Sequence, residues 1–202
     1  MQASGNQLLS TVGRRYNPWQ VLGEITRETF GQIITEREPI AAGDDIPVDV
    51  GLAHLAGRGL ATMNDKATAA LKAYLSGGGF LLAEAAAGDR NFDKSVRQVL
   101  AAAGLTLKPL GADSRVLSGR IGTSGQGFTV TAVGYTHALT AERIGKPQPL
   151  LFGIYLGDKV VGVYSPFDTT FAQTGCKAFD SLGYAAADAR ALAANIALLA
   201  AE

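Results

Sequence analysis

The sequence predicts an α/β domain built around an open, mostly parallel sheet. Short apolar runs alternate along the chain with stretches of helical amphipathic spacing, which is the pattern of β-α-β units. One apolar run, residues 80–83, contains no polar position, as expected for a central strand that is covered on both faces. A length of 202 residues suits one hydrophobic core. We therefore expect a single domain spanning residues 1–202.

Turn and cap residues place the boundaries of the predicted elements. Asn17 and Pro18 suit the N-cap and first turn of a helix, the glycines at 77–79 suit a helix end, and Gly157-Asp158 suits a hairpin turn. In the first part of the chain we predict a strand at 7–12, a helix from 17 to about 30, a short strand at 32–35, a loop at 36–45 and a strand at 48–55. A helix from 63 to the glycines at 77–79, a strand at 80–83, a loop at 85–89, a helix at 92–103 and an extended segment at 105–109 follow. The last part has a strand at 128–133 within the otherwise irregular residues 111–149, a hairpin of 150–156 and 159–164, and a closing helix at 184–201.

Charge and composition exclude several classes of partner. Lys and Arg number 18 and Asp and Glu number 18, whereas a surface for nucleic acid or acidic lipid needs a basic excess. No apolar run approaches the roughly 18 residues of a membrane span, so we expect no membrane insertion. The single cysteine, Cys176, excludes an internal disulfide. The first residues lack the pattern of a signal peptide, which leaves the localisation unknown.

Several motifs together resemble one known family. They are Tyr16-Asn17-Pro18, Gly57-Arg58-Gly59, the run from Gly78 to Glu84, Gly88, Phe92-Asp93-x-Ser95-x-Arg97, the run from Tyr164 to Asp168, and Ala194-Asn195-Ile196. With these motifs the chain resembles the bacterial domain of unknown function family 4159, which looks like a branch of the class I glutamine amidotransferase-like fold. That resemblance implies a doubly wound, flavodoxin-like sheet. Relatives are often exported, which favours an exported or periplasmic localisation.

Amidotransferase chemistry lacks its nucleophile in this sequence. It needs a cysteine on a sharp turn between strand and helix, with a histidine and an acid to activate it. Ala83-Glu84-Ala85 stands at that turn, and Cys176 lies far along the chain. His54 falls inside a predicted strand and His137 in a loop, so neither is close to Cys176 in sequence. The sequence therefore favours no catalytic residue.

Metal and cofactor sites are equally poorly supported. Two histidines more than eighty positions apart and one cysteine make no zinc motif. Glu84, Asp93 and Asp168 follow strands or open a helix at the same edge of the sheet, where they could together hold a divalent cation. The alternative, which we favour, is that each caps a helix or pairs with Arg58 or Arg97. We expect no metal and no cofactor.

The position of these residues suggests where a ligand would bind. Open α/β sheets bind ligands at the carboxyl ends of their strands. We expect Arg58, Glu84 and Asp168 at that edge, with Asp93 and Arg97 as an (i, i+4) pair on the next helix.

We interpret the chain as a non-catalytic domain that binds an unknown small ligand or a protein partner. The alternatives are a hydrolase with Glu84 as general base and Arg58 as electrostatic stabiliser, or a structural subunit of a larger assembly. A content of charged residues of 18% mildly favours association, including a homo-oligomer.

Overall fold

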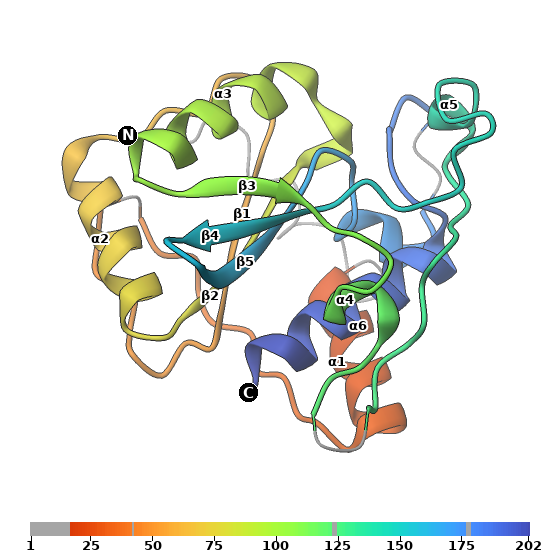
Figure 1. Ribbon diagram of the computed structural model, residues 1–202, viewed down its shortest axis with the longest axis horizontal. Coiled ribbons are helices and arrows are strands. Elements are labelled where there is room, and N and C mark those ends of the chain that lie inside the picture. The colour runs from red at the N-terminus through yellow and green to blue at the C-terminus, as the bar shows by residue number, and fades with distance from the viewer. Residues whose placement is uncertain (1–16, 42, 123–124, 177–178) are drawn as a thin grey trace.

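The computed structural model has a five-stranded sheet at its centre and helices on both sides (Figure 1). It describes residues 17–41, 43–122, 125–176 and 179–202. The helices are α1 (Pro18–Phe30), α2 (Asp65–Ser76), α3 (Arg90–Ala102), α4 (Arg115–Ser118), α5 (His137–Thr140) and α6 (Ala186–Ala200), with short 3-10 turns η3 (Ala86–Gly88) and η4 (Phe171–Thr174). The strands are β1 (Leu52–Gly57), β2 (Phe80–Ala85), β3 (Thr106–Pro109), β4 (Phe152–Leu156) and β5 (Lys159–Ser165).

The sheet is mostly parallel, as the sequence predicts. Its strand order is β1-β2-β5-β4-β3, in which β1, β2 and β5 pair in parallel and β4 is antiparallel to both of its neighbours. The β4-β5 hairpin turns at Gly157, whose φ of 62° lies in the left-handed region that glycine tolerates. The apolar run at 80–83 is confirmed as part of a central strand, because β2 has a parallel neighbour on each side and is buried along its whole length.

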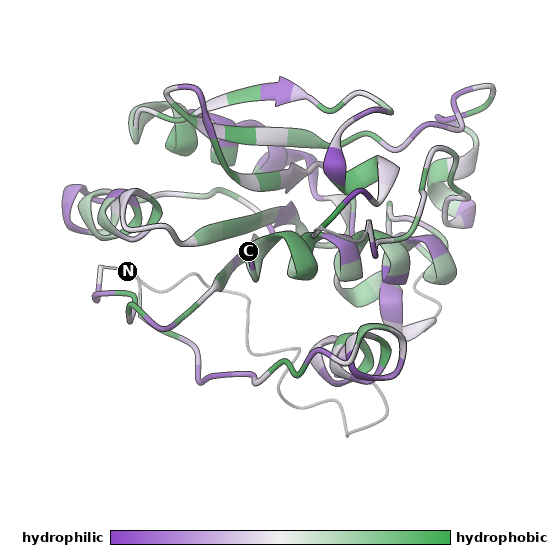
Figure 2. Cartoon of the chain, turned by 60° about the horizontal axis from the view of Figure 1, so that its bottom comes forward, coloured by the Kyte–Doolittle hydropathy of each residue, from purple (hydrophilic) through white to green (hydrophobic). Residues whose placement is uncertain are grey.

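Alternating side chains of β2 belong to two hydrophobic cores, one on each face of the sheet. Leu81 and Ala83 pack with the helices α2 and α3. Phe80 and Leu82 pack with α4 and α6 on the opposite face, and α1 lies outside α6, against Ala193 and Ala194. Figure 2 shows the inner strands coloured mainly as hydrophobic and the flanking helices as mixed. None of the described helices is long and apolar enough to cross a membrane.

The predicted N-cap of α1 is confirmed, and two further helices are capped in the same way. The Asn17 side chain accepts hydrogen bonds from the backbone N–H groups at the start of α1, and Asn64 and Asp89 do the same for α2 and α3. The end of β1 is shaped by a close contact rather than a cap. A β-carbon at Gly57 would lie 2.3 Å from Cε2 of Phe92, so the ring of Phe92 fills the space beside a bare backbone.

Three predicted strands differ in outcome. The strand predicted at 7–12 lies outside the described residues. The strand at 32–35 is wrong, because that segment has no ladder partner and the side chain of Ile33 is 81% exposed. The strand at 48–55 is displaced to Leu52–Gly57.

The strand predicted at 128–133 is also wrong, and a side chain explains why. Asn195 of α6 is fully buried and takes the place of a neighbouring strand. Its Oδ1 accepts from the backbone N–H of Phe128 (2.8 Å), and its Nδ2 donates to the carbonyls of Phe128 (2.7 Å) and Val116 (2.6 Å). This one amide thereby anchors an irregular segment to the core.

A buried amide with no partner offers a stability test. Both polar atoms of the Gln173 side chain are buried and make no hydrogen bond to the residues that the structure describes, and burying such a group costs about 1–3 kcal/mol. We expect Gln173→Met to raise the free energy of unfolding by about 1 kcal/mol in urea titrations, since methionine has a similar shape. The exposed Gln98→Met is the control and should change nothing. A loss of stability in Gln173→Met would contradict this reasoning.

Candidate functional site

His54 of β1 and Glu84 of β2 form a buried pair near the carboxyl ends of their strands. In the parallel register Ala56 pairs with Glu84, so His54 lies two residues earlier on the same face of the sheet. The His54 Nε2 is 2.9 Å from Oε1 of Glu84. Because a carboxylate only accepts, Nε2 carries the hydrogen of this bond. Trp19 of α1 packs edge-on against His54, with 4.9 Å between ring centroids.

The second oxygen of Glu84 holds the loop that follows β5. Oε2 accepts from the backbone N–H groups of Thr169 (2.8 Å) and Thr170 (3.0 Å). The Glu84 side chain is only 2% exposed, so no solvent-facing acceptor remains. Burial alone would raise the pKa of this carboxyl. The hydrogen bond and charge of His54, together with the donors from Thr169 and Thr170, outweigh burial and hold the pKa below its ordinary value.

Asp168 is a second buried carboxyl in the same cluster. Its Oδ2 accepts from the backbone N–H of Ala87 (2.7 Å) and its Oδ1 from that of Ala172 (2.8 Å). The bond to Ala87 holds that residue at a φ of 55°, a left-handed conformation that is uncommon outside glycine. Burial, followed by the charge of Glu84, raises the pKa of Asp168 to about 7.

Arg58 does not join this cluster. Its side chain is exposed just beyond the end of β1, and no ion pair or hydrogen bond joins it to Glu84 within the described part of the chain. The expected pairing of Glu84 with Arg58 is therefore not observed. Arg58 lies beyond Gly57, the last residue of β1, whereas His54 lies within the strand and bonds the carboxylate.

Asp93 and Arg97 form the expected pair, but on the other face of the sheet. Arg97 Nε is 2.7 Å from Oδ1 of Asp93, and the hydroxyl of Tyr164 donates to the same oxygen. The guanidinium carbon lies 4.5 Å from the ring centroid of Phe152 and 4.9 Å from that of Tyr164. Burial, and then Asp93, raises the pKa of Tyr164, which therefore stays a hydrogen-bond donor.

A pocket of about 320 Å³ opens beside this pair. It lies past the carboxyl ends of β2 and β5, where η3 leads into α3. Arg90 and Glu142 form an exposed ion pair among its residues. The lining consists of Gly88, Arg90, Asp93, Arg97, Glu142, Leu150, Pro166, Phe167 and Leu182.

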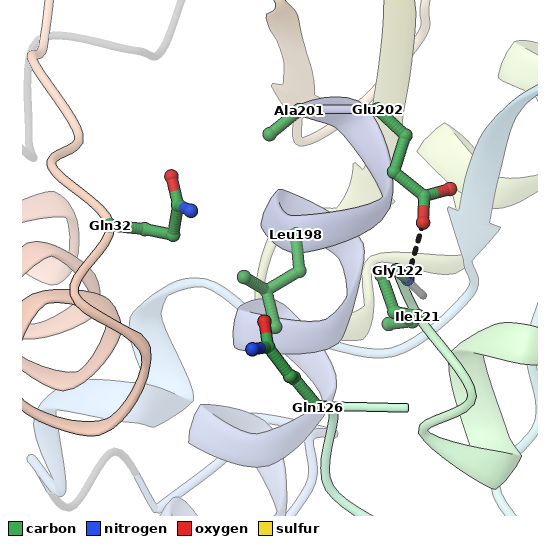
Figure 3. Close-up of a pocket in the computed structure, with 7 residues that line it drawn as sticks. All are labelled: Gln32, Ile121, Gly122, Gln126, Leu198, Ala201 and Glu202. Atoms are coloured by element: carbon green, nitrogen blue, oxygen red, sulfur yellow. Dashed lines mark hydrogen bonds between the residues drawn. The ribbon is translucent and has the colours of Figure 1, made fainter. Parts of the chain in front are cut away.

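A second hollow, of about 110 Å³, lies near the end of α6 (Figure 3). It is lined by Gln32, Ile121, Gly122, Gln126, Leu198, Ala201 and Glu202. The carboxylate of Glu202 already accepts from the backbone N–H of Gly122 and pairs with Arg115. Because α6 ends beside Gly51, just before β1, this hollow is at the amino ends of the parallel strands.

Comparison with known families agrees with the sequence motifs. The family DUF4159, described as a domain of unknown function, matches residues 19–200. The chain belongs to this family. No curated protein matches the chain.

The two buried carboxylates of this DUF4159 domain, Glu84 and Asp168, are both engaged in internal hydrogen bonds. No group of three His, Cys, Asp or Glu gathers as a metal site among the described residues. Cys176 lies after η4, where its backbone N–H donates to Thr174 Oγ1 (3.2 Å). Of the predicted residues, Glu84 and Asp168 come together, Asp93 and Arg97 meet at the pocket, and Arg58 stays apart.

The sequence interpretation of this DUF4159 domain missed His54 and the pocket residues Arg90, Glu142 and Phe167. For His54 a usable signal existed, because it is a polar residue inside one predicted strand, and Glu84 directly follows the next predicted strand, 80–83. The other three depend on tertiary contacts across the loop 141–150.

The Glu84–His54 pair predicts a stability effect. Glu84→Gln removes the charge and places an amide N–H₂ against either His54 or two backbone donors. We expect a loss of about 2–4 kcal/mol in the free energy of unfolding. His54→Gln and the double variant complete a cycle, in which the two losses should be strongly non-additive in chemical denaturation. Additive losses would show that the two side chains do not act on each other.

The raised pKa of Asp168 predicts a pH effect of known sign. Between the unfolded pKa of 3.8 and the folded value of about 7, the folded state holds a proton that the unfolded state has lost. The stabilising contribution of this group is complete below the unfolded pKa and is lost as pH rises through the folded pKa. The stability of the wild type relative to Asp168→Asn should therefore fall by about 2 kcal/mol between pH 5 and pH 7. Paired urea titrations at the two pH values measure this difference, and a constant difference would refute the assignment.

Proposed function

We propose that this DUF4159 domain is a non-catalytic binding module whose ligand occupies the pocket beside Asp93 and Arg97. The observation that carries the proposal is the position of that pocket. It lies beyond the carboxyl ends of β2 and β5, which is where open α/β sheets bind their ligands. Its volume of about 320 Å³ falls at the lower end of the range for small-molecule sites.

The use of the buried carboxylates supports binding over hydrolysis. A general base must reach the proton that it removes, yet both oxygens of Glu84 are engaged inside the protein. The Asp168 oxygens are likewise occupied by backbone donors. In this proposal Glu84 and Asp168 shape the loops around the pocket, and Asp93 and Arg97 contact the ligand.

The same proposal includes the finer fold assignment, a flavodoxin-like sheet of the amidotransferase-like type without its catalytic residues. Helices on both faces and three adjacent parallel strands support it. Glu84 lies near the carboxyl end of the buried strand β2, close to the point where that fold would carry its nucleophile.

A ligand screen tests the proposal. Compounds that bind the native state raise the melting temperature, so we expect hits from a library of small metabolites to stabilise the wild type. Leu182→Trp fills the pocket and should abolish these shifts. Leu60→Trp makes the same change at a leucine that is 79% exposed and outside the pocket lining, and it should leave them intact. Hits that survive Leu182→Trp, or a screen without hits, would count against the pocket.

A further inference from the structure

Arg97 is held rigidly from one side. Its Nε donates to Asp93, and its guanidinium carbon lies over the rings of Phe152 and Tyr164. Asp93 is itself fixed by the Tyr164 hydroxyl. A guanidinium that is already positioned loses little conformational freedom when it binds a further group.

Most of the hydrogen-bonding capacity of Arg97 is unused. A guanidinium has five N–H donors, and the hydrogen bond from Nε to Asp93 uses one of them. The side chain is 34% exposed and lines the pocket. Its two terminal nitrogens form the planar fork that binds carboxylate or phosphate with two parallel bonds.

Arg90 adds a second guanidinium from the same helix. Positions 90 and 97 are seven residues apart, so both lie on one face of α3, separated by about 10 Å along the axis. Arg90 pairs with Glu142, and the two side chains are 72% and 46% exposed. An ion pair this exposed contributes little, so an incoming anion can replace Glu142 as the partner of Arg90.

The rest of the pocket is apolar. Leu150, Pro166, Phe167 and Leu182 line it together with Gly88. A ligand that fits must therefore combine an anionic group with an apolar body.

We propose that the pocket binds a small organic oxyanion, with its carboxylate or phosphate group on the terminal nitrogens of Arg97 and its apolar part against Phe167 and Leu182. This inference rests on the proposed function and adds the class of ligand. The electrostatic attraction of Arg90 at the exposed side of the pocket assists binding.

Isothermal titration with four probes of similar shape tests the ligand class. The probes are benzoate, phenyl phosphate, the neutral benzamide and the cationic benzamidine. Inorganic phosphate is a fifth probe, which has the anionic group but no apolar part. We expect benzoate or phenyl phosphate to bind and the other three to bind at least tenfold more weakly. The comparison of benzoate with phenyl phosphate distinguishes the two sources of the oxyanion.

Variants assign the binding to Arg97. Arg97→Gln should weaken the anionic probe at least tenfold, and Arg97→Lys should weaken it less, since lysine keeps the charge but not the fork. Arg120→Gln, at an exposed arginine outside the pocket, is the matched control. Because Arg97→Gln removes the charged partner of Asp93, the melting temperature of each variant is measured to show that the fold is kept. Arg90→Gln provides a second variant at an exposed position and should weaken binding several-fold.

Three outcomes would overturn the inference. They are equal binding of benzamide and benzoate, preference for benzamidine, and anion binding that Arg97→Gln leaves unchanged. If no probe binds, the ligand class is also wrong. The proposed function is judged separately, by whether hits of the metabolite screen are lost in Leu182→Trp.

Discussion

The carboxylate of Glu84 ties together three segments that are distant in the sequence. One oxygen accepts from His54 in the neighbouring strand, and the other accepts from the backbone at Thr169 and Thr170. Each bond is charge-assisted and shielded from water, where such bonds are strongest. Without this carboxylate, the backbone N–H groups of Thr169 and Thr170 would lose their acceptor, and the turn after β5 would lose one of the contacts that fix it.

The sheet separates this internal cluster from the pocket. Glu84 faces the side of α6, whereas Asp93 and Arg97 belong to α3 on the opposite side. The segment 166–168 serves both, because Phe167 lines the pocket and the adjacent Asp168 binds the backbone of Ala87. The domain therefore places its rigid, fully bonded polar groups behind a pocket whose own charged residues are partly exposed. This division is what a binding site requires from its scaffold.

Local signals were sufficient for the elements whose structure is decided locally. Asn17-Pro18 indicates the start of α1, the apolar run indicates β2, and Gly157-Asp158 indicates the hairpin, since each depends on neighbouring residues alone. The partner of Glu84 could not be obtained in this way, because it depends on the register between β1 and β2. Residues 128–133 have strand composition, yet their backbone bonds go to partners outside any strand. Asn195, 67 positions after Phe128, bonds the N–H and carbonyl of Phe128, and the N–H groups of Val130 and Val133 donate to the carbonyls of Leu117 and Pro147. Pockets depend on such long-range contacts, which is why Arg97 was predicted as a site residue but Phe167 was not.

The contact between Gly57 and Phe92 has an evolutionary consequence. The aromatic ring occupies the volume in which any other residue at position 57 would carry its first side-chain carbon. A substitution at 57 is therefore tolerable only after position 92 has become smaller, and a smaller residue at 92 leaves a void until 57 enlarges. The two positions should change as a correlated pair across homologous sequences, with the order of the two changes constrained. Gly79 and Tyr74 stand in the same relation just before the start of β2.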